Sequence, residues 1–331
     1  MRIFSGIQPT GRKHLGNYIG ALTPWVAAQD RGEALYCIVD LHAISVPYEP
    51  AALRESVYDL AALLLAAGLD PGRCVFFRQS DVQEHTELTW LLSSVTAYGD
   101  LQRMHQFTDK SARQRELTSA ALFFYPVLMA ADVLAYRADE VPVGDDQRQH
   151  IELMRDIAER FNSRFGELLV VPEGWYPEVG ARIMDLQEPE RKMSTTGSSA
   201  QGTVYVLDEP EAILKKFRSA VTDSGSEVRR APDKPGVSNL IEILAAVRHL
   251  APSEVEAQFD GSGYGAFKTA VAEAVIDHLA PVRERYQELR ADEPALEEVM
   301  AAGAVEARSA CVPVLAEVRD AMGFGAVRAG R

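Results

Sequence analysis

The sequence contains only three cysteines, Cys37, Cys74 and Cys311, and they lie far apart along the chain. Structural zinc sites and iron–sulfur clusters need several cysteine or histidine ligands at short spacings, and this sequence shows no such group. A disulfide framework would need paired cysteines and an oxidising compartment. We therefore expect a cytoplasmic protein without zinc, an iron–sulfur cluster or any other bound structural metal.

Long hydrophobic runs and an excess of positive charge are also lacking. The most apolar stretch, residues 120–136, carries Pro126 and Asp132 and is too short for a membrane span. The chain has 34 basic and 48 acidic residues, which gives a net charge of −14. This balance disfavours non-specific binding to DNA or to anionic membranes, although it does not locate the charges. We expect a soluble protein that has neither as a partner.

Short apolar runs alternate with helical patterns over residues 1–222. Continuous apolar runs of strand length are typical of strands that are buried on both faces, and strand–helix alternation favours a parallel sheet. The pattern predicts an α/β fold, a Rossmann-like doubly wound parallel sheet, for a first domain over residues 1–222. The expected strands are residues 2–7, 34–40, 74–77 and 141–143, and the expected helices are residues 15–28, 51–67, 84–97 and 146–161.

Strand signals disappear beyond residue 222. We therefore predict a second, helical domain over residues 223–331, with residues 224–237 as the linker region. Its expected helices are residues 239–250, 253–259, 266–279, 282–289 and 294–322.

A glycine-containing turn joins the first expected strand to the first expected helix. Residues 6–17 read GIQPTGRKHLGN. In an open parallel sheet, ligands bind outside the carboxyl ends of the strands, and glycines allow a nucleotide to approach the backbone. His14 and Asn17 add hydrogen-bonding groups near the start of the helix. Alone, the segment is equally consistent with an ordinary strand–turn–helix corner.

A second segment of small residues contains two adjacent cations. Residues 191–197 read RKMSTTG, and two serines follow. Such a loop is able to close over a polyphosphate. Alone, it is better explained as a solvated surface loop.

One helical stripe contains a carboxylate. Tyr125, Met129, Asp132 and Tyr136 recur at helical spacing, and the rest of the stripe is apolar, so Asp132 is expected to face inward. A buried carboxylate needs a hydrogen-bond donor. The donor is either a structural partner in the protein or a group that arrives with a ligand, and the residues alone leave both possibilities open.

Taken together, the two loop segments resemble the H-I-G-H and K-M-S-K-S motifs of the class I aminoacyl-tRNA synthetases. Several further segments resemble the tryptophanyl branch of that family, namely residues 3–11, 16–20, 129–134, 141–147 and 180–184. The resemblance implies activation of L-tryptophan by ATP with Mg²⁺, followed by transfer to the 3′ end of tRNA(Trp). It also implies a homodimer whose helical domain reads the anticodon.

The resemblance assigns roles to individual residues. Those expected in catalysis are His14, Asn17, Lys110 and Lys192. Those expected to contact ATP are Gln8, Pro9, Thr10, Gly16, Asn17, Gly144, Asp145, Asp146, Ile183, Lys192, Met193, Ser194, Thr195 and Thr196. Those expected to bind tryptophan are Phe4, Gly6, His42, Tyr125, Met129, Asp132, Val141, Val143 and Gln147. Among these, Asp132 would select tryptophan by accepting a hydrogen bond from the indole N–H, which is only a donor.

Two other functions remain open. A tyrosyl-tRNA synthetase shares the fold and both motifs, although the Asp132 stripe and the opening segment argue against it. A non-charging paralogue, acting as an adenylate-forming or ligand-sensing protein, is the second alternative. It is suggested by Thr195, which stands where the family has the second lysine of its loop.

The effect of Thr195 is testable by restoring the lysine. If Arg191 or Lys110 already supplies the charge, as we expect, Thr195→Lys will change the single-turnover rate of adenylate formation little or will slow turnover. An uncompensated deficit predicts a gain of about tenfold for each 1.4 kcal/mol recovered. A large gain, together with no effect of Arg191→Ala or Lys110→Ala, would contradict compensation and favour the paralogue.

Overall fold

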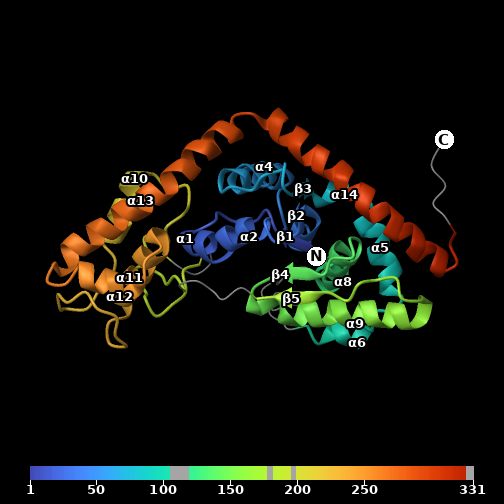
Figure 1. The fold of residues 1–331 in the computed structure, drawn as a ribbon, viewed down its shortest axis with the longest axis horizontal. Helices are drawn as coiled ribbons and strands as arrows, with labels where there is room; N and C mark the ends of the chain where they lie inside the picture. The colour runs from blue at the N-terminus through green and yellow to red at the C-terminus, as the bar shows by residue number, and fades with distance from the viewer. Residues whose placement is uncertain (105–118, 177–181, 195–198, 326–331) are drawn as a thin grey trace.

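A five-stranded parallel sheet forms the centre of the molecule in the computed structural model, which describes residues 1–104, 119–176, 182–194 and 199–325. The strand order is β3-β2-β1-β4-β5, so the direction of winding reverses between β1 and β4 (Figure 1). This confirms the predicted doubly wound sheet. The strands are β1 (Arg2–Ile7), β2 (Glu33–Ile38), β3 (Val75–Arg78), β4 (Glu140–Pro142) and β5 (Glu173–Trp175).

The edge strand β5 was not predicted. Its sequence, EGW, has no apolar run, and its side chains are exposed or half-buried. Among the described residues it pairs with β4 alone, from Glu140↔Glu173 to Pro142↔Trp175. Strands are recognised in a sequence by the hydrophobic pattern that burial requires. An edge strand this short buries too few side chains to produce such a pattern.

Strand β2 shows why its apolar run is continuous. Ala34, Tyr36 and Ile38 belong to the hydrophobic core on one face of the sheet. Leu35 and Cys37 belong to the core on the other face. Because successive side chains of a strand point to opposite faces, burial on both sides requires every position to be apolar.

Helices cover both faces of the sheet. The predicted helix over residues 15–28 is interrupted by a π-helical segment, Tyr18–Leu22, between α1 (Leu15–Asn17) and α2 (Thr23–Ala28). The predicted stop after residue 67 is confirmed, because Gly68 adopts φ +107° after the end of its helix. The other helices of this part are α3 (Asp40–Ala43), α4 (Pro50–Ala66), α5 (Glu84–Ser93), α6 (Tyr98–Gln102), α8 (Ala120–Leu134) and α9 (Arg148–Phe165), with 3₁₀ turns at Gln79–Asp81 (η2) and Asp145–Gln147 (η3).

The part of residues 223–331 that the structure describes is helical, as expected, but the helix boundaries differ. The helix predicted over residues 239–250 begins at Pro235, inside the predicted linker region of residues 224–237. The predicted break near residue 281 is wrong, because α13 continues through Pro281 as a single 28-residue helix. Proline removes one backbone donor but does not always end a helix. The helices of this region are α11 (Pro235–Arg248), α12 (Pro252–Gln258), α13 (Gly263–Arg290) and α14 (Glu293–Ala321), and α10 (Pro210–Arg218), which was not predicted, precedes it.

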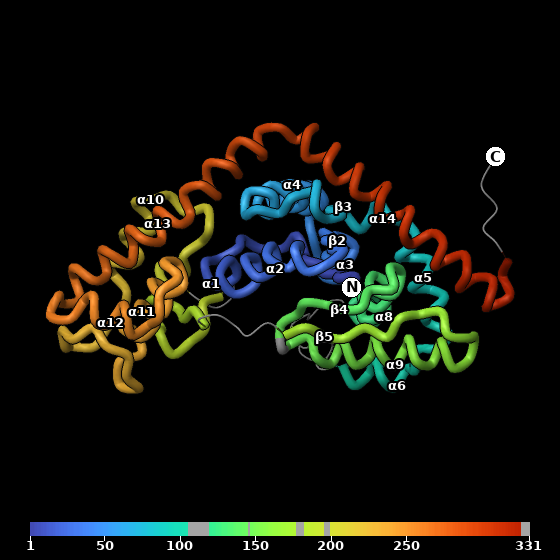
Figure 2. Tube along the Cα trace, viewed as in Figure 1, coloured from blue at the N-terminus to red at the C-terminus, as the bar shows by residue number. Residues whose placement is uncertain are grey.

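Helices α13 and α14 form the two sides of an arch over the molecule, as the colour change from orange to red shows (Figure 1, Figure 2). α13 packs with α10 and α11, whereas α14 runs back along β3 and α5. Leu296 and Met300 of α14 enter one core, and Ala307 enters the other. The last helix therefore shares its hydrophobic cores with the sheet. The boundary at residue 222 stays a prediction.

Helix α14 is long and unusually apolar, and its position in the fold accounts for part of this composition. Among the described residues, α14 is the one helix long and apolar enough to cross a membrane. Here its buried apolar side chains pack in the two hydrophobic cores, whereas Val305 and Val312 are exposed. Arg308 Nη2 lies 2.8 Å from Glu84 Oε1 of α5. Arg319 forms a second ion pair with Glu87 of the same helix. The buried apolar face of α14 is therefore that of a helix packed on a protein core.

Gly303 marks the closest approach of α14 to the sheet. A β-carbon at this position would overlap the carbonyl oxygen of Phe76 in β3. Alanine normally stabilises a helix relative to glycine by about 1 kcal/mol. We expect Gly303→Ala to do the opposite and lower the free energy of unfolding by about 1–3 kcal/mol, because the helix must move away.

Urea unfolding of the purified variants measures this effect. The matched control is Ala302→Gly, at an exposed position of α14, which tests helix propensity alone and should cost about 1 kcal/mol. If Gly303→Ala is neutral or stabilising, the close contact between α14 and β3 is not a constraint on the fold.

Candidate active site

The two loop segments singled out in the sequence line one pocket. Its volume is about 550 Å³, and it lies where β1 ends and α1 begins. The carboxyl end of β1 lies beside the point between β1 and β4 where the strand order reverses. Ligands usually bind at this position in such folds. The residues that line it are Thr10, Arg12, Lys13, His14, Asn17, Arg191, Lys192, Met193 and Ser194.

Backbone hydrogen bonds hold the two segments in place. Leu15 N–H donates to the carbonyl of Val204, 2.8 Å away, and Met193 N–H donates to the carbonyl of Ile183 at 3.1 Å. A β-carbon at Gly16 would lie 3.1 Å from His14 Nδ1 and 3.4 Å from the β-carbon of Ile183. Gly16 is therefore placed where the two segments approach each other, and a larger residue would press on both.

His14 is fixed by a reciprocal pair of hydrogen bonds. Its Nδ1 accepts from the N–H of Asn17 at 3.2 Å, and its own N–H donates to Asn17 Oδ1 at 3.2 Å. Burial, with smaller effects from the charges of Lys192 and Lys13, lowers the pKa of His14 to about 4. The ring is therefore neutral near pH 7. Because Nδ1 is an acceptor, the proton of the neutral ring lies on Nε2.

Four cationic side chains line this pocket, and they differ in their partners. Arg12 Nη2 lies 3.1 Å from Asp208, and Arg191 Nη1 lies 3.6 Å from Glu188. Lys13 Nζ instead donates to the carbonyls of Gln8 and Thr10 at 3.3 and 3.0 Å. Burial lowers the pKa of Lys13 to about 8.

Lys192 differs from these three cations. It is exposed and has no carboxylate partner within the described residues, so its charge is available to a ligand. Lys13 was not among the predicted site residues, although its place beside His14 in the first motif was visible in the sequence.

The residues expected to bind tryptophan come from three neighbouring elements. Phe4 lies in β1 and Val141 in β4, and both are buried in one core, against which the half-buried Met129 of α8 and Val143 pack. Gly6 is required by packing, because a β-carbon there would lie 2.8 Å from Val39 Cγ1. The structure thus brings the apolar members of the predicted set together around the ends of β1 and β4.

The polar members of that set have partners in the protein. Tyr125 OH lies 2.8 Å from His150 Nε2, and burial raises the pKa of Tyr125 to about 12. Gln147 Nε2 donates to Asp146 Oδ2 at 2.7 Å. Asp146 and Gln147 form the turn η3, which follows Gly144 after the end of β4. Lys110, Thr195 and Thr196 lie outside the described residues.

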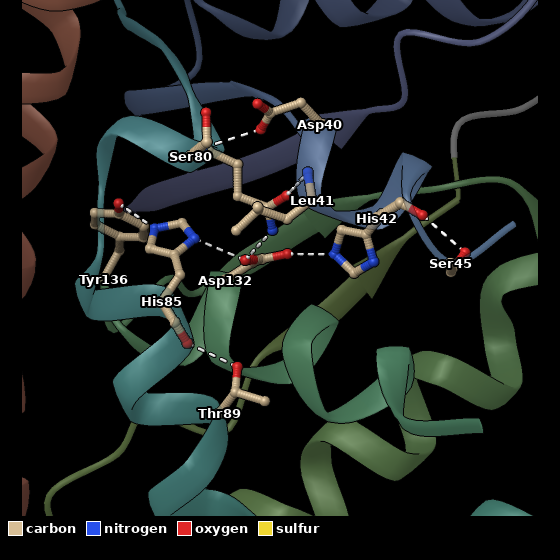
Figure 3. A network of polar contacts seen from close by, with 10 residues as sticks. Asp40, Leu41, His42, Ser45, Ser80, His85, Thr89, Asp132 and Tyr136 are labelled. Atoms are coloured by element: carbon tan, nitrogen blue, oxygen red, sulfur yellow. Dashed lines mark hydrogen bonds and ion pairs between the residues drawn. The ribbon is translucent and has the colours of Figure 1, made fainter. Parts of the chain in front are cut away.

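Asp132 is the centre of a buried polar network between two imidazole rings (Figure 3). Its Oδ2 lies 2.7 Å from His42 Nε2. Its Oδ1 lies 2.7 Å from Gln79 Nε2 and 2.7 Å from His85 Nδ1. Only 2% of Asp132 is exposed. The predicted inward orientation is confirmed, and structural partners within the protein are present.

The network keeps Asp132 ionised. Burial raises its pKa, but the hydrogen bonds from His42 and His85 outweigh burial and hold the pKa well below its usual range. Gln79 and His85 were missed by sequence reasoning. A signal existed, because Gln79 directly follows a predicted strand and the carboxyl ends of parallel strands meet at one edge.

Stability at acidic pH tests this ionised state. A group with a lowered pKa stabilises the fold above its unfolded pKa, about 3.9 for aspartate, and the stabilisation is lost as pH falls through the folded pKa. We expect Asp132→Asn to cost about 1.5–3 kcal/mol at pH 7, and the difference from the wild type to shrink below about pH 4. Urea unfolding of both proteins from pH 7 to 3 measures it, and a pH-independent difference would contradict the assignment.

Comparisons with known proteins agree with this geometry. The family model for tRNA synthetases of class I (W and Y) matches residues 1–280. A tryptophan–tRNA ligase 2 of Streptomyces avermitilis is 50% identical over 326 residues, covering 98% of this chain and 97% of that protein. A tryptophan–tRNA ligase of Wolinella succinogenes is 48% identical over 323 residues, covering 98% of both proteins.

A solved structure is similar over the whole chain. The tryptophanyl-tRNA synthetase of Campylobacter jejuni, complexed with ADP and tryptophan, superposes with a TM-score of 0.86 and 34% identity. The match covers 98% of this chain and 100% of that one. With the family model matched over most of its length and relatives half identical to it, the chain belongs to the class I tRNA synthetase family of the tryptophan and tyrosine enzymes.

Proposed function

We propose that this protein is a tryptophan–tRNA ligase, which forms tryptophanyl-adenylate from L-tryptophan and ATP and transfers the tryptophanyl group to tRNA(Trp). The observation that carries the proposal is the buried, ionised Asp132, placed beside the apolar side chains expected around an indole ring. The pocket formed by the two loop segments supplies the nucleotide site.

The acceptor capacity of Asp132 supports tryptophan as the amino acid. A carboxylate has about four acceptor positions, two on each oxygen. Oδ1 receives two donors, from Gln79 and His85, whereas Oδ2 receives only His42. One position on Oδ2 therefore remains for a ligand donor, and an indole N–H is such a donor. This arrangement reconciles the structural partners with the predicted role in selectivity.

The adenylation step needs no nucleophile from the protein. A carboxylate oxygen of tryptophan attacks the α-phosphorus of ATP, and the bond to the β,γ-phosphates breaks, so that pyrophosphate leaves with the electron pair. Catalysis is then positioning and charge stabilisation. Lys192 would place its ammonium group against the pyrophosphate, and the neutral His14 would donate a hydrogen bond from Nε2.

The pocket lining is compatible with Mg²⁺ that arrives with ATP. The residues lining the pocket include no carboxylate, and the described residues contain no group of three or more metal-binding side chains. Mg²⁺ is usually bound by substrate phosphates and water rather than by an all-protein cage. Bound in this way, it would neutralise charge on the phosphates.

Transfer to tRNA completes the proposed reaction. A ribose hydroxyl at the tRNA 3′ end attacks the carbonyl carbon of the adenylate, and AMP leaves. We propose that the helical domain, residues 223–331, contacts the anticodon. Its last helix packs on the sheet, so the same helix would link anticodon contacts to the catalytic domain. The three free, buried cysteines support a cytoplasmic location.

Exposed aromatic side chains support a homodimer. Trp90 of α5 is 74% exposed and Tyr98 of α6 is 67% exposed. Aromatic residues are enriched at protein interfaces, because burying each one removes a large apolar area from water. We propose that this aromatic surface is covered by a second copy of the chain.

Three assays test the function. ATP–pyrophosphate exchange should depend on tryptophan and not on tyrosine, and tRNA(Trp) should then accept labelled tryptophan. Exchange with tyrosine would instead identify a tyrosyl enzyme. Exchange with tryptophan but no charging of tRNA would identify the non-charging paralogue.

Sedimentation of the wild type and of Trp90→Ala measures the proposed dimer.

The role of Asp132 is testable with two ligands. We expect Asp132→Asn to weaken tryptophan binding about ten- to a hundred-fold, which corresponds to a lost hydrogen bond to a charged group, about 1.5–3 kcal/mol. The control ligand is 3-benzothienylalanine, in which sulfur replaces the indole N–H. Its binding should change little, and an equal loss for both ligands would exclude recognition of the N–H by Asp132.

A further inference from the structure

A second imidazole, behind Asp132, has no role in the function proposed above. His85 of α5 is fully buried, and both of its ring nitrogens have partners. Nδ1 lies 2.7 Å from Asp132 Oδ1, and Nε2 lies 2.6 Å from the hydroxyl of Tyr136 (Figure 3). The three side chains form a continuous relay that ends at the carboxylate.

Hydrogen-bonding chemistry identifies a tautomer of His85 that is compatible with both of its partners. Ionised Asp132 only accepts, so Nδ1–H of His85 must donate to it. In the tautomer of His85 that carries its proton on Nδ1, Nε2 accepts from the Tyr136 hydroxyl. Burial raises the pKa of Tyr136 well above its usual value, which keeps this hydroxyl protonated. One tautomer of His85 therefore satisfies the whole relay.

Aromatic packing holds the relay against the predicted tryptophan pocket. The ring of Tyr136 stacks on Phe4 with centroids 5.5 Å apart, and it meets Phe77 edge-on at 5.9 Å. His85 also meets Phe77 edge-on, at 6.0 Å. Neither ring can rotate freely in such a cluster, so the direction of the hydrogen bond to Asp132 is constrained.

We propose that His85, held by Tyr136, is a positioning residue that orients Asp132 so that its Oδ2 faces the amino-acid pocket. The inference rests on the proposed function, because it assigns an orienting partner to the selectivity carboxylate. Oδ1 is held in place by hydrogen bonds from His85 and Gln79. Oδ2 accepts a hydrogen bond from His42 and, in this proposal, a second one from the ligand.

This division of roles makes a specific prediction for His85→Leu. Asp132 keeps donors from His42 and Gln79 but loses its fixed orientation. We expect the KM for tryptophan in ATP–pyrophosphate exchange to rise about tenfold, by analogy with the loss caused when the orienting partner of a metal ligand is removed. The KM for ATP and kcat should stay within about twofold of the wild type, because the nucleotide pocket is built from other segments.

Two milder variants keep the proposal testable if His85→Leu does not fold. His85→Asn retains an N–H donor close to the position of Nδ1 and should restore part of the tryptophan affinity. Tyr136→Phe keeps the ring stacked on Phe4 but removes the donor to Nε2, and should raise the KM for tryptophan about threefold, a little over half a kcal/mol.

The matched control is Tyr36→Phe. Tyr36 is also fully buried, and its hydroxyl donates to the carbonyl of Trp25 at 2.7 Å, on the opposite face of the sheet. This variant removes a tyrosine hydroxyl that is as deeply buried as that of Tyr136 but does not contact His85 or Asp132. We expect the KM for tryptophan to remain unchanged in this variant, even if its thermal stability falls.

Comparison of tryptophan with 3-benzothienylalanine separates positioning from packing. A positioning role predicts that the His85 and Tyr136 variants lose affinity for tryptophan and not for the analogue, which lacks the N–H. Equal losses for both ligands, or no loss for either, would overturn the proposal. If Asp132→Asn itself fails to distinguish the two ligands, the proposed role of Asp132 has failed, which is a different result.

Discussion

Burying the charge of Asp132 is the constraint on which the arrangement of the active site depends. An ionised carboxylate with 2% exposure is costly unless several donors surround it. The chain meets this need with residues that follow two different strands, His42 after β2 and Gln79 after β3, and with His85 at the start of α5. Gln79 also accepts a hydrogen bond from the N–H of Leu41, at 3.1 Å. The carboxylate therefore ties the ends of β2 and β3 to α8.

The pocket proposed for the nucleotide differs, because part of its positive charge has no carboxylate partner within the described residues. Arg12 and Arg191 have acidic partners, Lys13 is held by backbone carbonyls, and Lys192 has no carboxylate partner within the described residues. The neutral His14 adds a donor without adding charge. A triphosphate would bring the missing negative charge, which accounts for a pocket with several cations and no carboxylate lining it.

The last helix connects these local features to the whole molecule. α14 belongs to both hydrophobic cores, and it approaches β3 so closely that only glycine fits at residue 303. Cys311 of the same helix is buried in the core that contains Tyr136, the far end of the relay to Asp132. The last helix and the core that contains Tyr136 are therefore parts of one packed structure, although the sequence pattern predicts two separate domains.

The sequence by itself determined the parallel sheet, because burial of β2 on both faces requires an unbroken apolar run. It also determined that the side chain of Asp132 points into the protein, because helical periodicity depends only on neighbouring residues. It also identified the two loop segments by resemblance to the family motifs. The assignment of single ligand contacts stays a prediction. Only the tertiary structure decided which donors meet Asp132, since His42, Gln79 and His85 come from separate elements and no spacing connects them. It likewise decided that α14 returns to the sheet and that Lys192 has no carboxylate partner in the part of the chain that the structure describes. Periodicity records which face of an element is buried, whereas long-range packing determines what covers that face.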